Sequence, residues 1–140
     1  MHLDHRFRSV YQALPTCLRP DLPQTFDLDM IGNKRYLVEQ RVFMGITLHN
    51  RLMRLHRAYM STGYEEPQFR YSTDCCIESA FALLDLAGQS RQVLCRWWVV
   101  VVHIWTAGLV LGSEILRGGQ GSDALDRRKE GVLKAISLLE

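Results

Sequence analysis

The sequence predicts an all-α domain of about four helices, packed around a long apolar central helix at about residues 91–117. The central helix is indicated by residues 97–112 (WWVVVVHIWTAGLVLG), an apolar stretch that is too long for one strand. The chain holds no second strand-like stretch that could pair with it. A helix that is apolar on all sides is normally enclosed by other helices. The length of 140 residues suits one such domain.

The N-terminal part, residues 1–33, is expected to be irregular and proline-rich, with a short helix at residues 4–13. Three prolines fall within nine positions: Pro15, Pro20 and Pro23. Each proline fixes its own φ and disfavours helical geometry in the residue before it. The helical domain is therefore expected at residues 34–140.

A long amphipathic helix is predicted from about Lys34 to Ser61. Apolar residues recur there at spacings of four, four, three and four, which places them on one helical stripe: Met44, Leu48, Leu52, Leu55 and Tyr59. Gly63 is expected to end this helix, because glycine is the common residue after a helix C-terminus. Residues 62–71 are then expected to form a loop.

The next helix is predicted to begin at Ser72, whose hydroxyl suits an N-cap, and to end near Gly88. Its inward face is expected to contain Cys76, Ala80, Leu83, Leu84 and Ala87. The glycines at positions 118, 119 and 121 should end the central helix. A last helix should follow, with these residues turned inward: Leu125, Val132, Ile136 and Leu139.

Charge and cysteine content exclude several classes of protein. The 17 Lys and Arg against 15 Asp and Glu give a net charge of +2, too small to indicate a nucleic-acid partner. The four cysteines (Cys17, Cys75, Cys76 and Cys95) contain no Cys-x-x-Cys pair, so they are expected to be reduced thiols.

The apolar stretch at residues 97–112 is also the one candidate for a membrane-spanning segment. As a helix it would span roughly 24 Å, short of a hydrocarbon core of about 30 Å. It contains His103, and Glu114 follows two residues beyond its end. We therefore expect the core helix of a protein that does not enter the membrane.

No motif in the sequence indicates catalysis, a cofactor or a metal ion. Gly-x-Ser-x-Gly and the phosphate-binding Gly-Lys-Ser/Thr motif are absent. His49 and His56 are seven residues apart, which separates them by roughly 10.5 Å on a helix, too far to share one metal ion. Three arginines near the end of the first long helix lack the interleaved aromatic residues of a nucleic-acid surface: Arg51, Arg54 and Arg57.

The tryptophans of the apolar stretch allow two interpretations. Trp98 and Trp105 are seven residues apart and share one face of a helix. Their rings suit core packing, because each buries a large apolar area. Alternatively they contribute to an apolar pocket for an effector molecule, lined by Trp98, Trp105, His103, Cys76 and Met44.

Two short motifs, in order, carry a resemblance to a known family. Residues 54–59 (RLHRAY) supply Leu55, His56, Arg57 and Tyr59 near a helix end, and Ser72, Cys76 and Ala80 follow in the next helix. This arrangement resembles the C-terminal half of the regulatory, or middle-homology, domain of fungal zinc-cluster transcription factors. The resemblance covers about residues 12–117. Ala58 stands where that family usually has proline.

The resemblance implies a fragment of a nuclear transcription factor that regulates transcription through partner or effector contacts and is not an enzyme. Contact with DNA would require the six-cysteine zinc-cluster module of that family, which this sequence lacks. Because the match is partial, an apolar face is expected to remain uncovered and to favour contact with a protein partner or self-association. The alternative is a helical protein that binds a small molecule, or an enzyme of unknown reaction.

Overall fold

The computed structural model describes residues 2–22, 35–90, 94, 96–118 and 121–140. Over these residues it contains six α-helices, three short 3-10 turns and no strand, which confirms the all-α fold class. The irregular segment expected before the first long helix lies in large part outside the described residues, since 23–34 are not among them.

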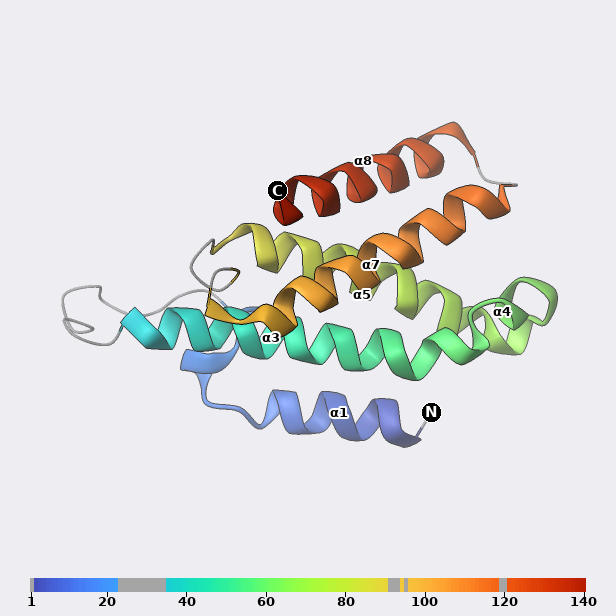
Figure 1. Ribbon diagram of the computed structural model, residues 1–140. Helices are drawn as coiled ribbons and strands as arrows, with labels where there is room; N and C mark the ends of the chain where they lie inside the picture. The colour runs from blue at the N-terminus through green and yellow to red at the C-terminus, as the bar shows by residue number, and fades with distance from the viewer. Residues whose placement is uncertain (1, 23–34, 91–93, 95, 119–120) are drawn as a thin grey trace.

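Five helices of more than two turns run back and forth (Figure 1). They are α1 (His2–Gln12), α3 (Arg35–His56), α5 (Arg70–Gly88), α7 (Trp98–Arg117) and α8 (Ser122–Leu139). The short helix expected near the N-terminus is α1, which packs against α3. At the opposite side of the bundle, α8 packs against α7 and α5.

The centre of the bundle is α5. Ten of its 19 residues are buried, against six of 20 in α7, because α5 packs against α3, α7 and α8 at once. The inward face predicted for this helix is confirmed: Cys76, Ala80, Leu83, Leu84 and Ala87 are all buried. They meet Ile46 and Met53 of α3 and Ile104 and Leu111 of α7 in one core.

The long apolar helix is present as α7, but the expectation that other helices enclose it on all sides is wrong. Val100, Ile104 and Leu111 are buried, whereas Trp98 is 78% and Trp105 58% exposed. The helices described here pack on one side of α7 only, so its other side faces outward. An apolar composition makes burial of a helix favourable, but it does not ensure that another helix of the same chain covers each side.

The first long helix ends earlier than predicted. α3 stops at His56 and is followed by a 3-10 turn (Arg57–Tyr59) and the four-residue helix α4 (Thr62–Glu65). Gly63 does not end α3; it is buried within α4, where a Cβ would lie 2.6 Å from the carbonyl oxygen of Phe69 and would also collide with Thr73 Oγ1. Glycine is required there because α4 approaches α5 so closely.

Replacing Gly63 with Ala is expected to lower the free energy of unfolding by about 1–3 kcal/mol, since a methyl group at this position must displace backbone atoms. Chemical denaturation measures the change. Gly112→Ala is the control, because no atom lies within 4 Å of a Cβ added there. Equal stability of the two variants would contradict the close approach.

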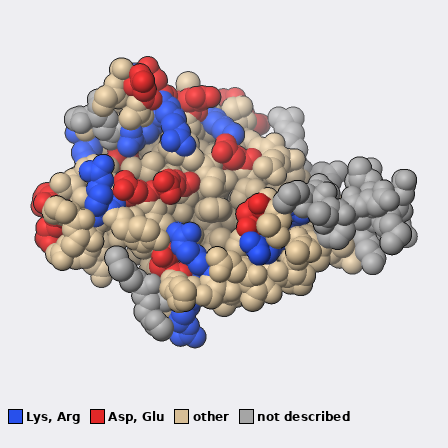
Figure 2. All heavy atoms as spheres, turned by 180° about the vertical axis from the view of Figure 1, so that it is seen from behind, with Lys and Arg blue, Asp and Glu red and all other residues tan. Residues whose placement is uncertain are grey.

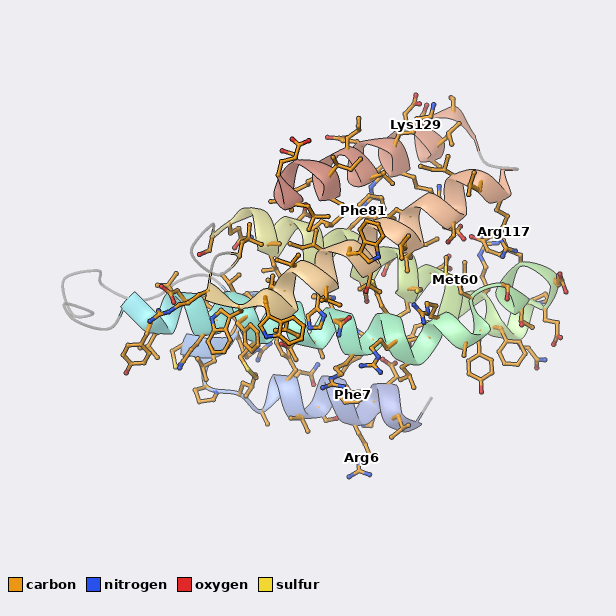
Figure 3. The ribbon with its side chains drawn as sticks, in the orientation of Figure 1. Arg6, Phe7, Met60, Phe81, Arg117 and Lys129 are labelled. Atoms are coloured by element: carbon orange, nitrogen blue, oxygen red, sulfur yellow. The ribbon has the colours of Figure 1, made fainter. Side chains whose placement is uncertain are left out.

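Two further details of the prediction differ from the structure. α5 begins at Arg70, so Ser72 is not its N-cap but a buried residue of its first turn. On α8 the buried residues are Gly131 and Ala135, while Ile136 and Leu139, expected to point inward, are 49% and 37% exposed. A Cβ on Gly131 would lie 2.5 Å from Leu111 and 2.8 Å from the ring of Phe81. Because Gly131 and Ala135 are small, their side of α8 is the one that packs closely against α5 and α7. The Phe81 side chain that approaches Gly131 is labelled in Figure 3.

Candidate interaction surface

The five residues of the expected effector pocket do not come together in one cavity. Trp105 lines a groove between α7 and α8, and Met44 lines a different hollow, beside Trp97 and Phe43. Cys76 is fully buried in the core, with its thiol 3.7 Å from the carbonyl oxygen of Met53. Trp98 points outward, and the partly buried His103 has a lowered pKa because of burial and the nearby Arg51 and Arg54.

The groove between α7 and α8 has a volume of about 550 Å³ and is lined almost entirely by apolar groups. Gly108 and Gly112 form part of its lining on α7, and Ala135 and Ile136 part of it on α8. No atom lies within 4 Å of a Cβ added at Gly112. The small residues therefore leave room on this side of the bundle for a side chain from another molecule.

The outer face of α7 continues this apolar surface along the helix. Exposed apolar residues recur at spacings of one, three, four and seven: Trp98, Val101, Val102, Trp105, Leu109 and Leu116. We call these six residues the α7 stripe. Residues 97–113 contain no Asp, Glu, Lys or Arg, so the stripe carries no formal charge before Glu114. A continuous apolar area of this kind commonly marks a contact site.

α7 is long and apolar enough to be a candidate membrane span, with a mean hydropathy of 1.8 over its most apolar 18 residues. Of these 18 residues, 33% are buried within the protein. One helix of this kind is weak evidence for a membrane span, because core helices of soluble proteins pass the same test. The C-terminal part of α7 also holds Glu114, a carboxylate that is only 1% exposed.

Glu114 fixes the end of α7 to the α4 region. Its carboxylate accepts a hydrogen bond from the hydroxyl of Tyr64 and lies 4.0 Å from Arg117. The Arg117 guanidinium lies over the Tyr64 ring at 4.5 Å, at the end of α7 that faces α4 in Figure 3. Burial and the bond to Glu114 raise the pKa of Tyr64, so this hydroxyl remains a donor at neutral pH.

The residues that carried the family resemblance are mostly structural. His56 Nδ1 lies 3.1 Å from Ser72 Oγ, which joins the end of α3 to the start of α5. Cys76 and Ala80 are buried where α5 packs on α3, and Leu55 is partly buried. Arg57 and Tyr59 are exposed, with the Tyr59 ring stacked on Phe69 at 5.3 Å.

The arginines at positions 51, 54 and 57 are exposed, but charge on this protein is mixed. On the face drawn in Figure 2, Lys and Arg side chains alternate with Asp and Glu, and no broad basic area appears. Such a face lacks the positive field that nucleic-acid binding requires.

A polar cluster that the sequence did not reveal lies between α1, α3 and α5. Asp4, His56 and Cys75 each offer a ligand atom, and these atoms lie within 4.8 Å of one another. Arg8 Nε donates to Asp4 Oδ1 at 2.9 Å, and the Tyr71 hydroxyl donates to Asp4 Oδ2 at 2.7 Å. Positions 4, 56 and 75 share no sequence spacing, because only the packing of three helices unites them.

The electrostatics of this cluster favour an ionised Asp4 beside a neutral His56 and a neutral Cys75 thiol. Burial opposes ionisation of Asp4, but the hydrogen bonds from Tyr71 and Arg8 outweigh it and lower the pKa of this carboxyl. Burial lowers the pKa of His56 and raises the pKa of the Cys75 thiol. The positive charge of Arg8, whose side chain is 43% exposed, thus balances the buried Asp4.

Comparison with known proteins supports a link to transcription. The chain is 25% identical to the agnestins biosynthesis cluster transcription factor AgnL11 of Paecilomyces divaricatus, over 98% of its own length and 19% of that protein. It is 23% identical to the probable transcription factor lepB of Aspergillus flavus, over 99% of its own length and 26% of that protein. No protein-family model matches the chain, and no solved structure matches it. The chain is therefore distantly similar to fungal transcription factors and spans about a fifth to a quarter of the length of these two relatives.

Proposed function

We propose that this chain is a non-catalytic helical module of a fungal transcription factor, of the middle-homology type, which controls transcription in the nucleus through protein contacts. Its distant similarity to two transcription factors supports the role in transcription. The order of the two motifs, around His56 and around Ser72, supports the regulatory-domain assignment. DNA would be bound by a separate module, because this sequence lacks the six-cysteine zinc cluster of that family.

The observation that carries this proposal is the α7 stripe with its adjoining groove. Trp98, Trp105 and Leu109 are each more than half exposed on a helix with no charge over residues 97–113. A soluble protein rarely leaves such a surface uncovered unless a partner covers it. The buried Glu114, bonded to Tyr64, supports a helix that packs in a soluble module rather than one that crosses a bilayer.

The occupant of this surface is a second copy of the chain. Positions 98, 105 and 112 repeat at intervals of seven, so a two-fold axis at Trp105 would place Trp98 of one copy opposite Gly112 of the other in an antiparallel pair. The same axis sets Val102 opposite Gly108 and Val101 opposite Leu109. Trp98 would then meet Gly112, where no atom lies within 4 Å of an added Cβ, and no charge would be buried.

A reporter assay tests the function. The chain, fused to a heterologous DNA-binding module, is expected to change reporter transcription relative to that module alone. Val102→Lys should abolish the change, because it places a charge in the stripe. Val10→Lys is the matched control, since Val10 is equally apolar and 68% exposed but lies on α1. No change by the wild-type chain, or equal loss with both variants, would contradict the proposal.

The small-molecule alternative is favoured by the volume of the groove, which lies in the range of ligand pockets. If an apolar molecule is the natural occupant, it should raise the unfolding temperature of the wild-type chain but not of Gly112→Leu, whose side chain would fill the groove. A ligand with this behaviour, together with a monomeric chain, would replace self-association as the mode of regulation.

A further inference from the structure

Three helices that are distant in sequence, α1, α3 and α5, bring a nitrogen, an oxygen and a sulfur ligand atom together at one point between them. Asp4, His56 and Cys75 are all buried, and their ligand atoms lie within 4.8 Å of one another. His56 Nε2 is 3.6 Å from Asp4 Oδ1. In a tetrahedral site with metal–ligand distances of 2.0–2.3 Å, the ligand atoms are about 3.5 Å apart. Two of the three donors already have this separation.

An unsatisfied nitrogen indicates that something can bind at this point. His56 is 4% exposed, and its Nε2 atom has no hydrogen-bond partner. Buried polar atoms are nearly always paired, so an unpaired one calls for an explanation. When Ser72 Oγ accepts the hydrogen of His56 Nδ1, Nε2 carries a lone pair 3.6 Å from Asp4 Oδ1 and can bind a cation there. In the other tautomer an Nε2–H faces Asp4 instead, and metal binding releases that proton.

The surroundings of the cluster match the outer shell of a metal site. Metal-binding histidines usually hold their other ring nitrogen in a hydrogen bond, and metal-binding carboxylates are themselves hydrogen-bonded. Here Ser72 Oγ lies 3.1 Å from His56 Nδ1, and the Tyr71 hydroxyl donates to Asp4 Oδ2 at 2.7 Å. Nε2 and Oδ1 then lie 3.6 Å apart, and Oδ1 also accepts a hydrogen bond from Arg8 Nε.

The geometry points to a site for one transition-metal ion of the zinc class, bound by Asp4 Oδ1, His56 Nε2 and Cys75 Sγ. Mixed nitrogen, oxygen and sulfur ligands suit Zn²⁺ or Co²⁺ rather than Mg²⁺ or Ca²⁺. Three protein ligands leave a fourth position for water. On binding, the Cys75 thiol loses its proton to solvent and coordinates as a thiolate.

Arg8 is the cation that the metal ion would replace. Its Nε atom lies 2.9 Å from Asp4 Oδ1, and its Nη2 atom lies 3.3 Å from Cys75 Sγ. The Arg8 side chain is 43% exposed, so it can turn into solvent without crossing the core. Because Arg8 competes for the same ligands, its removal should strengthen metal binding.

A titration of the reduced, chelator-treated chain with Co²⁺ tests the site. We expect saturation at one equivalent, with the thiolate-to-cobalt charge-transfer absorption, and loss of that absorption when Zn²⁺ displaces Co²⁺. Cys75→Ser should remove the charge-transfer absorption and weaken binding by about tenfold or more. Cys76→Ser is the matched control, because the neighbouring thiol faces Met53 in the core. Arg8→Gln should bind Co²⁺ about tenfold more tightly than the wild-type chain.

Asp4→Asn provides a second test if Cys75→Ser fails to fold, as judged by its helical circular dichroism. It keeps the size of the side chain but should weaken Co²⁺ binding by about tenfold or more. Absence of saturable binding in both the wild-type chain and Arg8→Gln would overturn the site. So would a charge-transfer absorption that persists in Cys75→Ser, because the thiolate ligand would then be another cysteine.

Discussion

Val102→Lys is expected to convert an associating chain into a monomer at concentrations where the wild-type chain forms dimers. Val102 is 46% exposed on the α7 stripe, and in the antiparallel pair it would pack against α7 of the second copy. Burying an unpaired polar group costs about 3 kcal/mol, and the two-fold pair would bury one in each copy, so association should weaken by at least roughly 100-fold. Sedimentation equilibrium over a range of concentrations measures the dissociation constant. Val10→Lys on α1 should associate like the wild-type chain.

The Gly112→Leu variant distinguishes the antiparallel α7 pair from non-specific hydrophobic association. Added apolar surface would increase non-specific association, but in the two-fold arrangement the leucine occupies the space that Trp98 of the second copy needs. The variant should therefore dimerise at least about tenfold more weakly, since overpacking costs about 1–3 kcal/mol. It should fold normally, because no atom lies within 4 Å of a Cβ at this position. A wild-type monomer at all concentrations, or undiminished dimers of Gly112→Leu, would exclude the pairing.

Glu114→Ala is expected to lower the free energy of unfolding by about 2–4 kcal/mol, because it opens a cavity at a fully buried site and removes a charged hydrogen-bond acceptor. The Tyr64 hydroxyl loses its acceptor, and the tie between α7 and α4 is broken. Urea denaturation, followed by circular dichroism, gives the difference.

Two comparisons sharpen this result. Glu114→Gln keeps the volume and an acceptor oxygen, so it should recover about half of the lost stability, or about 1–2 kcal/mol relative to the alanine variant. Glu130→Ala, at an exposed position of α8, should change stability by no more than about 0.5 kcal/mol. If Glu114→Ala is as stable as Glu130→Ala, the buried contact with Tyr64 does not hold the end of α7.

Part of the interaction surface could be predicted from the sequence. The seven-residue spacing of Trp98 and Trp105 places both on one face of a helix, and both are more than half exposed in the structure. Their environment could not be predicted, because spacing gives the face of a helix but not which faces meet another element. The groove could not be predicted either. Gly108 and Gly112 line it only because Ala135 and Ile136 of α8 lie across from them, and the sequence does not show that α8 packs there.

Apolar periodicity and length are local properties, so they predict the helical class and the positions of most helices. They also predict the inward face of α5, where Cys76, Ala80 and Leu83 share one side. Packing between helices establishes three features that local patterns do not contain: α5 lies at the centre, α7 is covered on one side, and Asp4 lies beside His56 and Cys75. These features depend on contacts between residues distant in sequence. Such contacts form where small residues, such as Gly63 and Gly131, allow two segments to approach each other closely.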